Sequence, residues 1–420
     1  MEKTMNVHGK FDMAERPHRP GPFWTLVEWT ASAFMLLSSR HKYIKHGYRR
    51  IKGPAIILST HASFIDFPIA LRASFPHSTR WVCSIEEFNG REWLFRKIGV
   101  ICKRKFTNDI VMVRHVLFAL RKQKANVIIY PEARFSMIGI NEQLDNSLGK
   151  LAKAAHVPVY VLNCHGDFIR SPQWDKHPYR KIPLVTDGYL IASKEEVAAL
   201  PAEEIQRRIE EKFVTDDFAW QKEHHYKVKS SGRATNLHKV LYQCPHCLKE
   251  HIMNSKGTTL WCESCGVTYE LDEFGNLKCL NGTAKFTHAP DWYRWERQYI
   301  RDLVRSGKYR FEDDVYLEEL VSSHEGFVRK GIVRFTQDDN GITLDGTLDD
   351  KTPFHLHKPI HSMYSIHVEY DYKERGDALD IATVDDTWFI YPKNAKNVLT
   401  KLHFATEELF LYHKELGDKK

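Results

Sequence analysis

Residues 57–71 read ILSTHASFIDFPIAL, and this stretch changes from an apolar strand pattern to a helical pattern within a few residues. The strand pattern begins near Pro54, and the helical pattern begins at about Asp66. His61 and Asp66 therefore lie where a strand is expected to end and a helix to begin. An imidazole and a carboxylate at this spacing offer a general base and the group that orients it, so the stretch predicts an α/β fold and a catalytic pair.

The same alternation continues on the C-terminal side of this stretch. The apolar runs TRWVCSI, NVIIYPE and VPVYVLNC alternate with the helical patterns NDIVMVRHVLFALRKQK and LGKLAKAAH, and residues 203–213 close the series as a helix. Such alternation predicts an α/β core with a mostly parallel sheet. The polar residues 223–239 indicate a linker, so we place this first domain at residues 1–225.

An apolar helix is expected at residues 23–37, before the first strand. Fifteen residues of helix measure about 22 Å, which is shorter than a hydrocarbon core of roughly 30 Å, so this helix should not span a bilayer. Thr25, Glu28 and Ser32 share one face, and the opposite face is apolar. Two interpretations remain open, a core helix of its own domain or a helix inserted shallowly into a membrane surface. The basic residues of the stretch 40–52 suit solvent or anionic lipid.

The bulk composition is that of an ordinary folded protein. Of 420 residues, 42% are apolar and 27% are charged, without the bias that marks disordered chains. This length suits two or three domains, because single cores rarely exceed roughly 250 residues. The N-terminus shows no secretory signal, and we expect a cytoplasmic protein that lies peripherally on the inner face of the membrane.

Two CxxC pairs separated by fourteen residues indicate a metal site within residues 238–290. The four residues are Cys244, Cys247, Cys262 and Cys265. Two such knuckles can bring four thiolates around one tetrahedral Zn²⁺, and we expect a zinc ribbon with structural zinc. His246, His251 and Cys279 are expected to be bystanders.

The C-terminal part, residues 310–420, predicts a small β-rich domain. Asn340 and Gly341 lie between two alternating apolar runs, which is a strong hairpin signal. An aromatic and charged helix at residues 291–307 precedes these strands, and a last helix at about residues 396–416 follows them. Strand count and the final helix resemble pleckstrin-homology-like folds, and we assign this domain no ligand.

Four motifs in order resemble the glycerophospholipid acyltransferase family, its lysophosphatidate acyltransferase-like group, over residues 40–215. The HxxxxD motif is HASFID at residues 61–66. A block that begins with glycine and usually ends with arginine is GVICKRK at residues 99–105. The PEGTR block is PEARFS at residues 131–136, and an apolar strand with proline is VPVYV at residues 157–161. The resemblance implies an α/β acyltransferase domain.

Two of these blocks depart from the family pattern. Lys105 stands where arginine is usual, and Ala133 replaces the glycine of PEGTR, so Arg134 lies one position early. Neither change removes the base or the cationic character. We interpret both as variation within the family that leaves the geometry of substrate binding open.

The resemblance also implies the chemistry of the site. His61 would take the proton of an acceptor hydroxyl as it attacks a thioester, and Asp66 would orient the imidazole, so neither a catalytic metal nor a covalent acyl-enzyme is implied. A phosphorylated acceptor needs cations, and the candidates are Lys105, Arg104 and Arg134. Glu132 would bind acceptor hydroxyls or hold those cations. Which of Lys103, Arg104 and Lys105 contacts phosphate stays open.

The expected reaction is transfer of an acyl group from acyl-CoA or acyl carrier protein to a lysophospholipid, with 1-acyl-glycerol-3-phosphate as acceptor and phosphatidate as product. Another lysolipid or glycerol phosphate is an alternative acceptor. A zinc-ribbon adaptor or nucleic-acid-binding protein with a degenerate acyltransferase domain is the alternative from another class. The intact His61 and Asp66 argue against it, and no nucleic acid is expected because the ribbon lacks a Lys/Arg stripe with interleaved aromatic residues.

Overall fold

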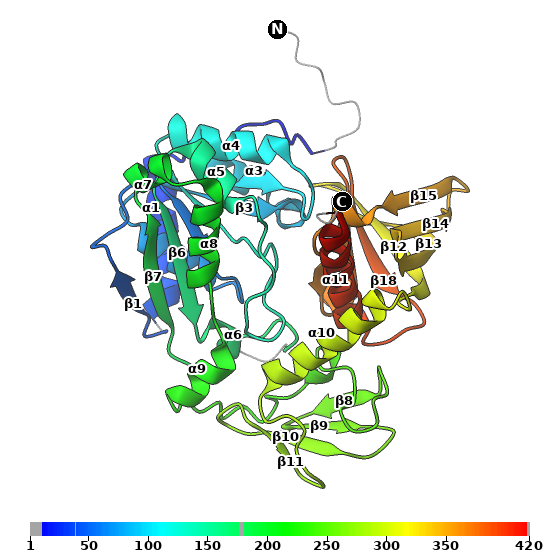
Figure 1. Cartoon of the computed structure of the whole chain (residues 1–420). Coiled ribbons are helices and arrows are strands. Elements are labelled where there is room, and N and C mark those ends of the chain that lie inside the picture. The colour runs from blue at the N-terminus through cyan, green and yellow to red at the C-terminus, as the bar shows by residue number, and fades with distance from the viewer. Residues whose placement is uncertain (1–10, 38, 176–179, 418–420) are drawn as a thin grey trace.

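Three sheets follow one another along the chain in the computed structural model, which describes residues 11–37, 39–175 and 180–417 (Figure 1). The first sheet has seven strands in the order β1-β7-β6-β2-β5-β3-β4. They are β1 (Lys42–His46), β2 (Ile56–Ser59), β3 (Thr79–Ser84), β4 (Ile101–Lys103), β5 (Asn126–Ile129), β6 (Val159–His165) and β7 (Val185–Ala192). Neighbouring strands run parallel except for β6 and β7. The expected mostly parallel sheet is confirmed.

Helices cover both faces of this sheet, because successive side chains of a strand point to opposite faces. Ile56 and Leu58 of β2 pack in one cluster with apolar residues of four helices, whereas Ile57 packs in another with Leu71. The first face carries α4 (Ile110–Arg121), α5 (Leu148–Ala155), α7 (Lys194–Ala199) and α8 (Ala202–Lys212). The second carries α2 (Asp66–Ser74), with α1 (Pro22–Leu37), the 3-10 helix η1 (Ile85–Phe88) and α3 (Glu92–Ile98) around it. The short helices α6 (Asp167–Arg170) and α9 (Asp217–Glu223) complete this part.

Helix α1 turns its polar face towards the protein. Glu28 and Ser32 line a cavity of the protein, while large apolar side chains point outward. The exposed ones are Phe23, Leu26, Val27, Phe34 and Leu37. No helix in the described part of the chain is both long and apolar enough to cross a membrane.

The second sheet is small and antiparallel, with the order β11-β10-β9-β8. Its strands are β8 (Met253–Lys256), β9 (Thr259–Cys262), β10 (Thr268–Leu271) and β11 (Leu277–Cys279), and helix α10 (Ala289–Arg305) follows. The preceding residues 223–239 were expected to be a linker, but Val228 and Leu237 are buried in the same apolar cluster as Tyr269 and Trp292. This segment therefore belongs to the packed structure.

The third sheet has seven antiparallel strands in the order β15-β14-β13-β12-β18-β17-β16. They are β12 (Phe311–Ser322), β13 (Gly326–Asp338), β14 (Gly341–Thr347), β15 (Pro353–Lys358), β16 (His367–Glu369), β17 (Ala378–Ala382) and β18 (Thr387–Pro392), and helix α11 (Leu399–Gly417) packs on them. The predicted hairpin at Asn340 and Gly341 joins β13 to β14. A β-rich unit with a final helix is present, and its pleckstrin-homology-like identity stays a prediction.

One apolar core connects all three parts. It runs from Met137 and Trp174, in the part that carries the first sheet, through Trp292 of α10 to Phe404 of α11. Figure 1 shows α10 and α11 in contact beside the third sheet, and Arg297 of α10 donates to a Glu408 carboxylate oxygen at 2.7 Å. The units that the sequence separates are therefore packed together.

Candidate active site

His61 and Asp66 meet at the turn between β2 and α2. Nδ1 of His61 lies 3.1 Å from Oδ2 of Asp66. The histidine side chain is 12% exposed and the aspartate side chain is fully buried. The polypeptide brings the pair together because the turn after β2 is short and Asp66 is the first residue of α2.

Local hydrogen bonds hold the Asp66 carboxylate in place. Its Oδ2 accepts the backbone N–H groups of Ala62 at 2.8 Å and Ser63 at 2.9 Å, in addition to its contact with His61. These donors and the N-terminal end of α2 stabilise a negative charge. A carboxylate fixed on one side of the imidazole selects the tautomer that carries its proton on Nδ1 and leaves Nε2 free to accept a proton.

Aromatic side chains fix the plane of the His61 ring. The ring stacks on Tyr130 with centroids 4.0 Å apart and an angle of 23°, and Phe135 lies 4.3 Å away on a tilted plane. Tyr130 directly follows β5, and Phe135 lies in the loop after that strand. The imidazole is thus held by rings as well as by its hydrogen bond.

A cavity of about 910 Å³ lies next to His61. Most of its wall is apolar and comes from helices and strands of the first sheet, including Met35, Phe67, Leu71, Phe95, Met112 and Leu151. Tyr364, His367 and Glu369 of the C-terminal unit close another part of the wall. A volume of this size, mostly apolar with a few polar groups, is typical of a small-molecule site.

Glu132 lies behind the turn that carries His61. Its Oε2 accepts the backbone N–H of His61 at 3.3 Å, and its Oε1 accepts that of Glu142 at 3.0 Å. Burial raises the pKa of the Glu132 carboxyl to about 8, although these two hydrogen bonds and Arg134 act in the opposite direction. Glu132 does not line the large cavity, so its contacts connect the end of β5 to the turn that carries His61.

Two of the expected phosphate-binding cations contact the C-terminal unit. The Lys105 ammonium lies in the cavity wall, 3.8 Å from Glu86 and 3.9 Å from Asp380. Burial alone would lower the pKa of Lys105, but these carboxylates raise it overall. Arg104 donates to the backbone carbonyls of Val384 at 3.0 Å and Asp385 at 2.6 Å. Both cations therefore bridge two parts of the chain.

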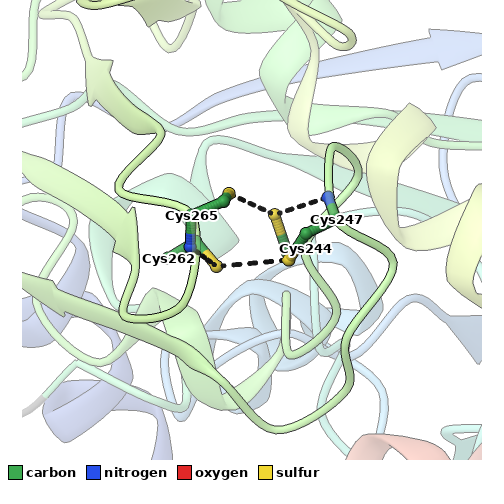
Figure 2. Close-up of side chains that lie close together, drawn as sticks. All are labelled: Cys244, Cys247, Cys262 and Cys265. Carbon is green, nitrogen blue, oxygen red and sulfur yellow. Dashed lines mark hydrogen bonds between the residues drawn. The ribbon is translucent and has the colours of Figure 1, made fainter.

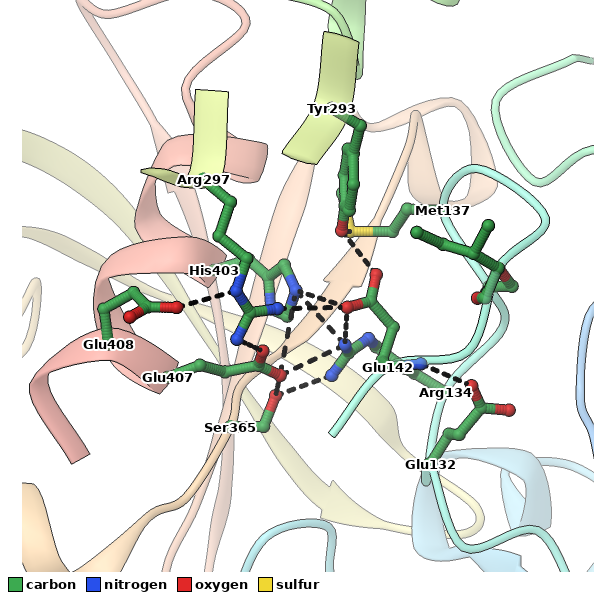
Figure 3. Close-up of polar contacts among 12 residues, drawn as sticks. Glu132, Arg134, Met137, Glu142, Tyr293, Arg297, Ser365, His403, Glu407 and Glu408 are labelled. Atoms are coloured by element: carbon green, nitrogen blue, oxygen red, sulfur yellow. Dashed lines mark hydrogen bonds and ion pairs between the residues drawn. The ribbon is translucent and has the colours of Figure 1, made fainter. Parts of the chain in front are cut away.

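Arg134 belongs to a buried ionic network (Figure 3). Its guanidinium donates to Ser365 Oγ at 2.6 Å and to Glu407 Oε1 at 3.1 Å, and it lies 3.5 Å from Glu142. Arg297 of α10 binds the other oxygen of Glu407 at 2.7 Å. These contacts use both terminal nitrogens of Arg134 to hold α10 and α11 against the part of the chain that carries the first sheet.

Lys103 lies in β4 beside these cations, and it also lines the large cavity. Its ammonium makes no hydrogen bond or ion pair with any residue that the structure describes, whereas its backbone pairs with β3. Burial lowers the pKa of its ammonium, while Asp145 and Asp109 act in the opposite direction. Lys103 is therefore positioned to meet a negative group that enters the cavity.

The four cysteines of the two CxxC pairs converge (Figure 2). All four Sγ atoms lie within 4.8 Å of one another, and the Cys244 to Cys265 and Cys247 to Cys262 distances are both 3.6 Å. Four sulfurs at about 2.3 Å from a tetrahedral Zn²⁺ would be about 3.8 Å apart, so the residues present fit that ion. His246 binds the Tyr269 hydroxyl at 2.9 Å and stands outside the cluster.

Several residues at the site were missed by reasoning from sequence. Tyr130 directly precedes the third motif and Phe135 lies within it, and this position was the only signal. Tyr364 and Glu369 lie about 300 positions from His61, and nothing in the local pattern indicates that they reach the cavity. Asp167 lies against Asp66, and it had no signal either.

Comparisons with known proteins concern the part of the chain that carries His61 and Asp66. Residues 40–164 match the model of the family described as Acyltransferase. Among solved structures, the chain is similar to the 1-acyl-sn-glycerophosphate (LPA) acyltransferase PlsC from Thermotoga maritima, at 17% sequence identity, over 45% of this chain and 76% of that chain, with a TM-score of 0.35. No curated protein matches the chain. The family match confirms the resemblance found in the four motifs.

Proposed function

Since residues 40–164 form an acyltransferase-family domain, we propose that the chain transfers an acyl group from acyl-CoA or acyl carrier protein to the free hydroxyl of a lysophospholipid. The proposed acceptor is 1-acyl-glycerol-3-phosphate, and the product is phosphatidate. The observation that carries the proposal is that His61, paired with the buried Asp66, lines a largely apolar cavity. Such a cavity offers room for acyl chains beside a general base.

In this proposal, Nε2 of His61 removes the proton of the acceptor hydroxyl while its oxygen attacks the thioester carbonyl. Asp66 holds Nδ1–H and stabilises the imidazolium that forms. The tetrahedral intermediate then collapses, the carbon–sulfur bond breaks, and the thiolate takes the proton from Nε2. One ester and one thiol are formed, and the imidazole returns to its starting state.

We assign the acceptor phosphate to Lys103. Lys105, Arg104 and Arg134 lie near it in sequence or space, but each is already engaged with the C-terminal unit. Lys105 forms an ion pair with Asp380, and the two arginines donate hydrogen bonds to groups of that unit. The ammonium of a lysine in a partly apolar wall is already desolvated before a ligand binds. If it has no hydrogen-bond or ion-pair partner, an anionic ligand contributes more binding free energy there than at a cation that is already paired. Lys105, Arg104 and Arg134 then stabilise the packing of the C-terminal unit against the first domain.

Substitution of Lys103 by methionine is expected to raise the KM for lysophosphatidate roughly tenfold or more, the size of a lost hydrogen bond to a charged group. The kcat should change less, because the base is untouched. Steady-state kinetics with the acceptor varied would measure both constants. Lys122→Met removes an exposed lysine at the end of α4 and serves as the matched control. An unchanged KM in Lys103→Met would contradict the assignment.

We also propose that the apolar face of α1 contacts the membrane surface. That face is exposed, and Trp24 and Trp29 extend it by packing on Trp93 and Phe75, which are themselves exposed. Exposed basic residues follow directly, among them Arg40, Lys42, Lys45, Arg49 and Arg50. An apolar face with neighbouring cations matches an anionic lipid surface.

The double substitution Phe34→Ser and Leu37→Ser is expected to weaken partition onto anionic vesicles about tenfold or more. Both side chains are 76% exposed, so the fold loses little, whereas burial of such side chains in lipid contributes roughly 1.5–3 kcal/mol each. Cosedimentation with vesicles of phosphatidylglycerol and phosphatidylcholine would measure the partition. Leu280→Ser changes an exposed leucine next to the cysteine ribbon and is the control. Equal partition of the two variants would count against the contact.

The experiment that tests the function is acyl transfer from labelled acyl-CoA, or from labelled acyl carrier protein, to lysophosphatidate in mixed vesicles. Lysophosphatidylcholine and glycerol phosphate are offered as competing acceptors in the same reaction. Labelled phosphatidate as the main product supports the proposal. A preference for either competitor replaces the acceptor but keeps the reaction class, and absence of transfer to all three would refute the proposal.

We propose in addition that Cys244, Cys247, Cys262 and Cys265 hold one structural Zn²⁺. Their sulfur spacing supports this assignment. Bound there, the ion would crosslink two turns of the small sheet, and no step of the acyl transfer involves it.

A further inference from the structure

A second carboxyl group lies against the catalytic aspartate. Asp167 is the first residue of α6 and is buried. One of its carboxylate oxygens, one of Asp66 and Sγ of Cys164 all lie within 4.8 Å of one another. Asp167 does not reach the large cavity, and instead lines a void of about 10 Å³ that also touches His61 and Glu132.

The surroundings of this pair cannot accommodate two negative charges at low cost. The titratable groups that face Asp167 are Asp66 and Asp217, the Cys164 thiol and the Tyr130 phenol, with Glu132 and His61 across the small void. His165 lies 3.7 Å from Asp217 on its other side. Two buried carboxylates at this separation repel each other strongly, so one of them holds a proton.

The hydrogen bonds identify which carboxyl is neutral. Asp66 Oδ2 accepts two backbone N–H groups and faces His61 Nδ1, all of which stabilise its ionised form. Asp66 Oδ1 and Asp167 Oδ2 find no other hydrogen-bond partner among the described residues. Burial and the charge of Asp66 raise the pKa of Asp167 well above its usual range. The proton therefore belongs to Asp167.

We propose that Asp167 is a positioning residue whose protonated carboxyl donates a hydrogen bond to Oδ1 of Asp66 and so holds that carboxylate in line with His61. The role of Asp167 in the reaction rests on the proposed function, whereas the presence of a proton between Asp167 and Asp66 does not. In acyl transfer the substrate proton ends on the leaving thiol, so Asp167 keeps its own proton throughout the cycle.

The proposal has a consequence at alkaline pH. The hydrogen bond exists while Asp167 is protonated, and it is lost as the pH rises through the pKa of Asp167 in the folded chain. Ionisation would also place a second negative charge beside Asp66. Activity should therefore fall on the alkaline side, with Asp167 as the group that titrates.

The first test needs no substrate. Infrared difference spectra between the intact chain and Asp167→Asn near neutral pH are expected to show the C=O stretch of a protonated carboxylic acid that the variant lacks. Loss of carboxylate bands alone would overturn the proposal. This outcome is readable even where the intact chain transfers no acyl group, so failure of the proposed function and failure of this inference are distinguishable.

The second test compares two variants in the acyl-transfer assay. Asp167→Ala removes the donor and should lower kcat roughly 10- to 100-fold with little change in KM. Asp167→Asn keeps an N–H donor of similar shape, should recover most of that loss, and should retain activity at alkaline pH where the intact chain has lost it. An asparagine variant as slow as the alanine variant, or with the alkaline fall unchanged, would overturn the proposal, with Tm values measured for both.

Discussion

Substitution of His61 by alanine is expected to lower kcat for acyl transfer by on the order of 10²- to 10⁴-fold, the usual contribution of a general base. The imidazole is the one group at the turn placed to accept a proton on the cavity side, because Asp66 occupies its other nitrogen. Labelled acyl-CoA and lysophosphatidate in mixed vesicles give the rate. Circular dichroism and a Tm measurement establish that the variant is folded.

The chain offers a matched control for this substitution. His156 is an exposed histidine of the same domain, with the left-handed backbone (φ 55°) at the end of α5 that asparagine tolerates well. His156→Asn should keep the full rate. If His61→Ala retained more than about a tenth of the activity while folded, a different group would have to act as the base.

Removal of zinc is expected to have the largest effect on stability. Binding of structural Zn²⁺ contributes roughly 10–16 kcal/mol of apparent free energy in isolated zinc fingers, and here the ribbon core continues into α10 through Trp292. Incubation with a chelator should lower the Tm by on the order of 10 °C or more, and added Zn²⁺ should restore it. Metal analysis of the purified chain should give one zinc per chain.

Two cysteine variants separate metal binding from a general loss of thiols. Cys262 is buried within the cluster, whereas Cys279 lies on β11 of the same sheet and outside the cluster. Cys262→Ser should lose the zinc and the stability that depends on it, and Cys279→Ser should keep both. Loss of zinc in both variants, or in neither, would argue against the assigned ligands.

Local patterns predicted those parts of the site whose partners are close in sequence. His61 and Asp66 are five residues apart, so the short turn alone brings them together. The spacing of the four cysteines likewise implies two turns that face each other. The strand and helix patterns around Pro54 predicted the mostly parallel sheet, because buried parallel strands form continuous apolar runs.

The partners of the cations could not be predicted in this way. Whether Lys105 faces substrate or protein depends on Asp380, which lies 275 positions later and belongs to another sheet. Polar composition also predicted a linker at residues 223–239, where a few apolar residues such as Val228 suffice to anchor the segment in the core. Both differences arise from packing between distant parts of the chain, which periodicity does not encode.

The tie between Arg134 and Glu407 has a consequence for biosynthesis. The two residues are 273 positions apart, and a ribosome that adds about 5–20 residues per second needs roughly 14–55 s to cover that distance. During this interval the first domain has emerged with the Arg134 guanidinium facing no counter-ion from α11. The first domain is synthesised before α11, but its Arg134 gains the Glu407 counter-ion only after α11 has been synthesised. Newly made chains should therefore remain susceptible to proteases until α11 is released.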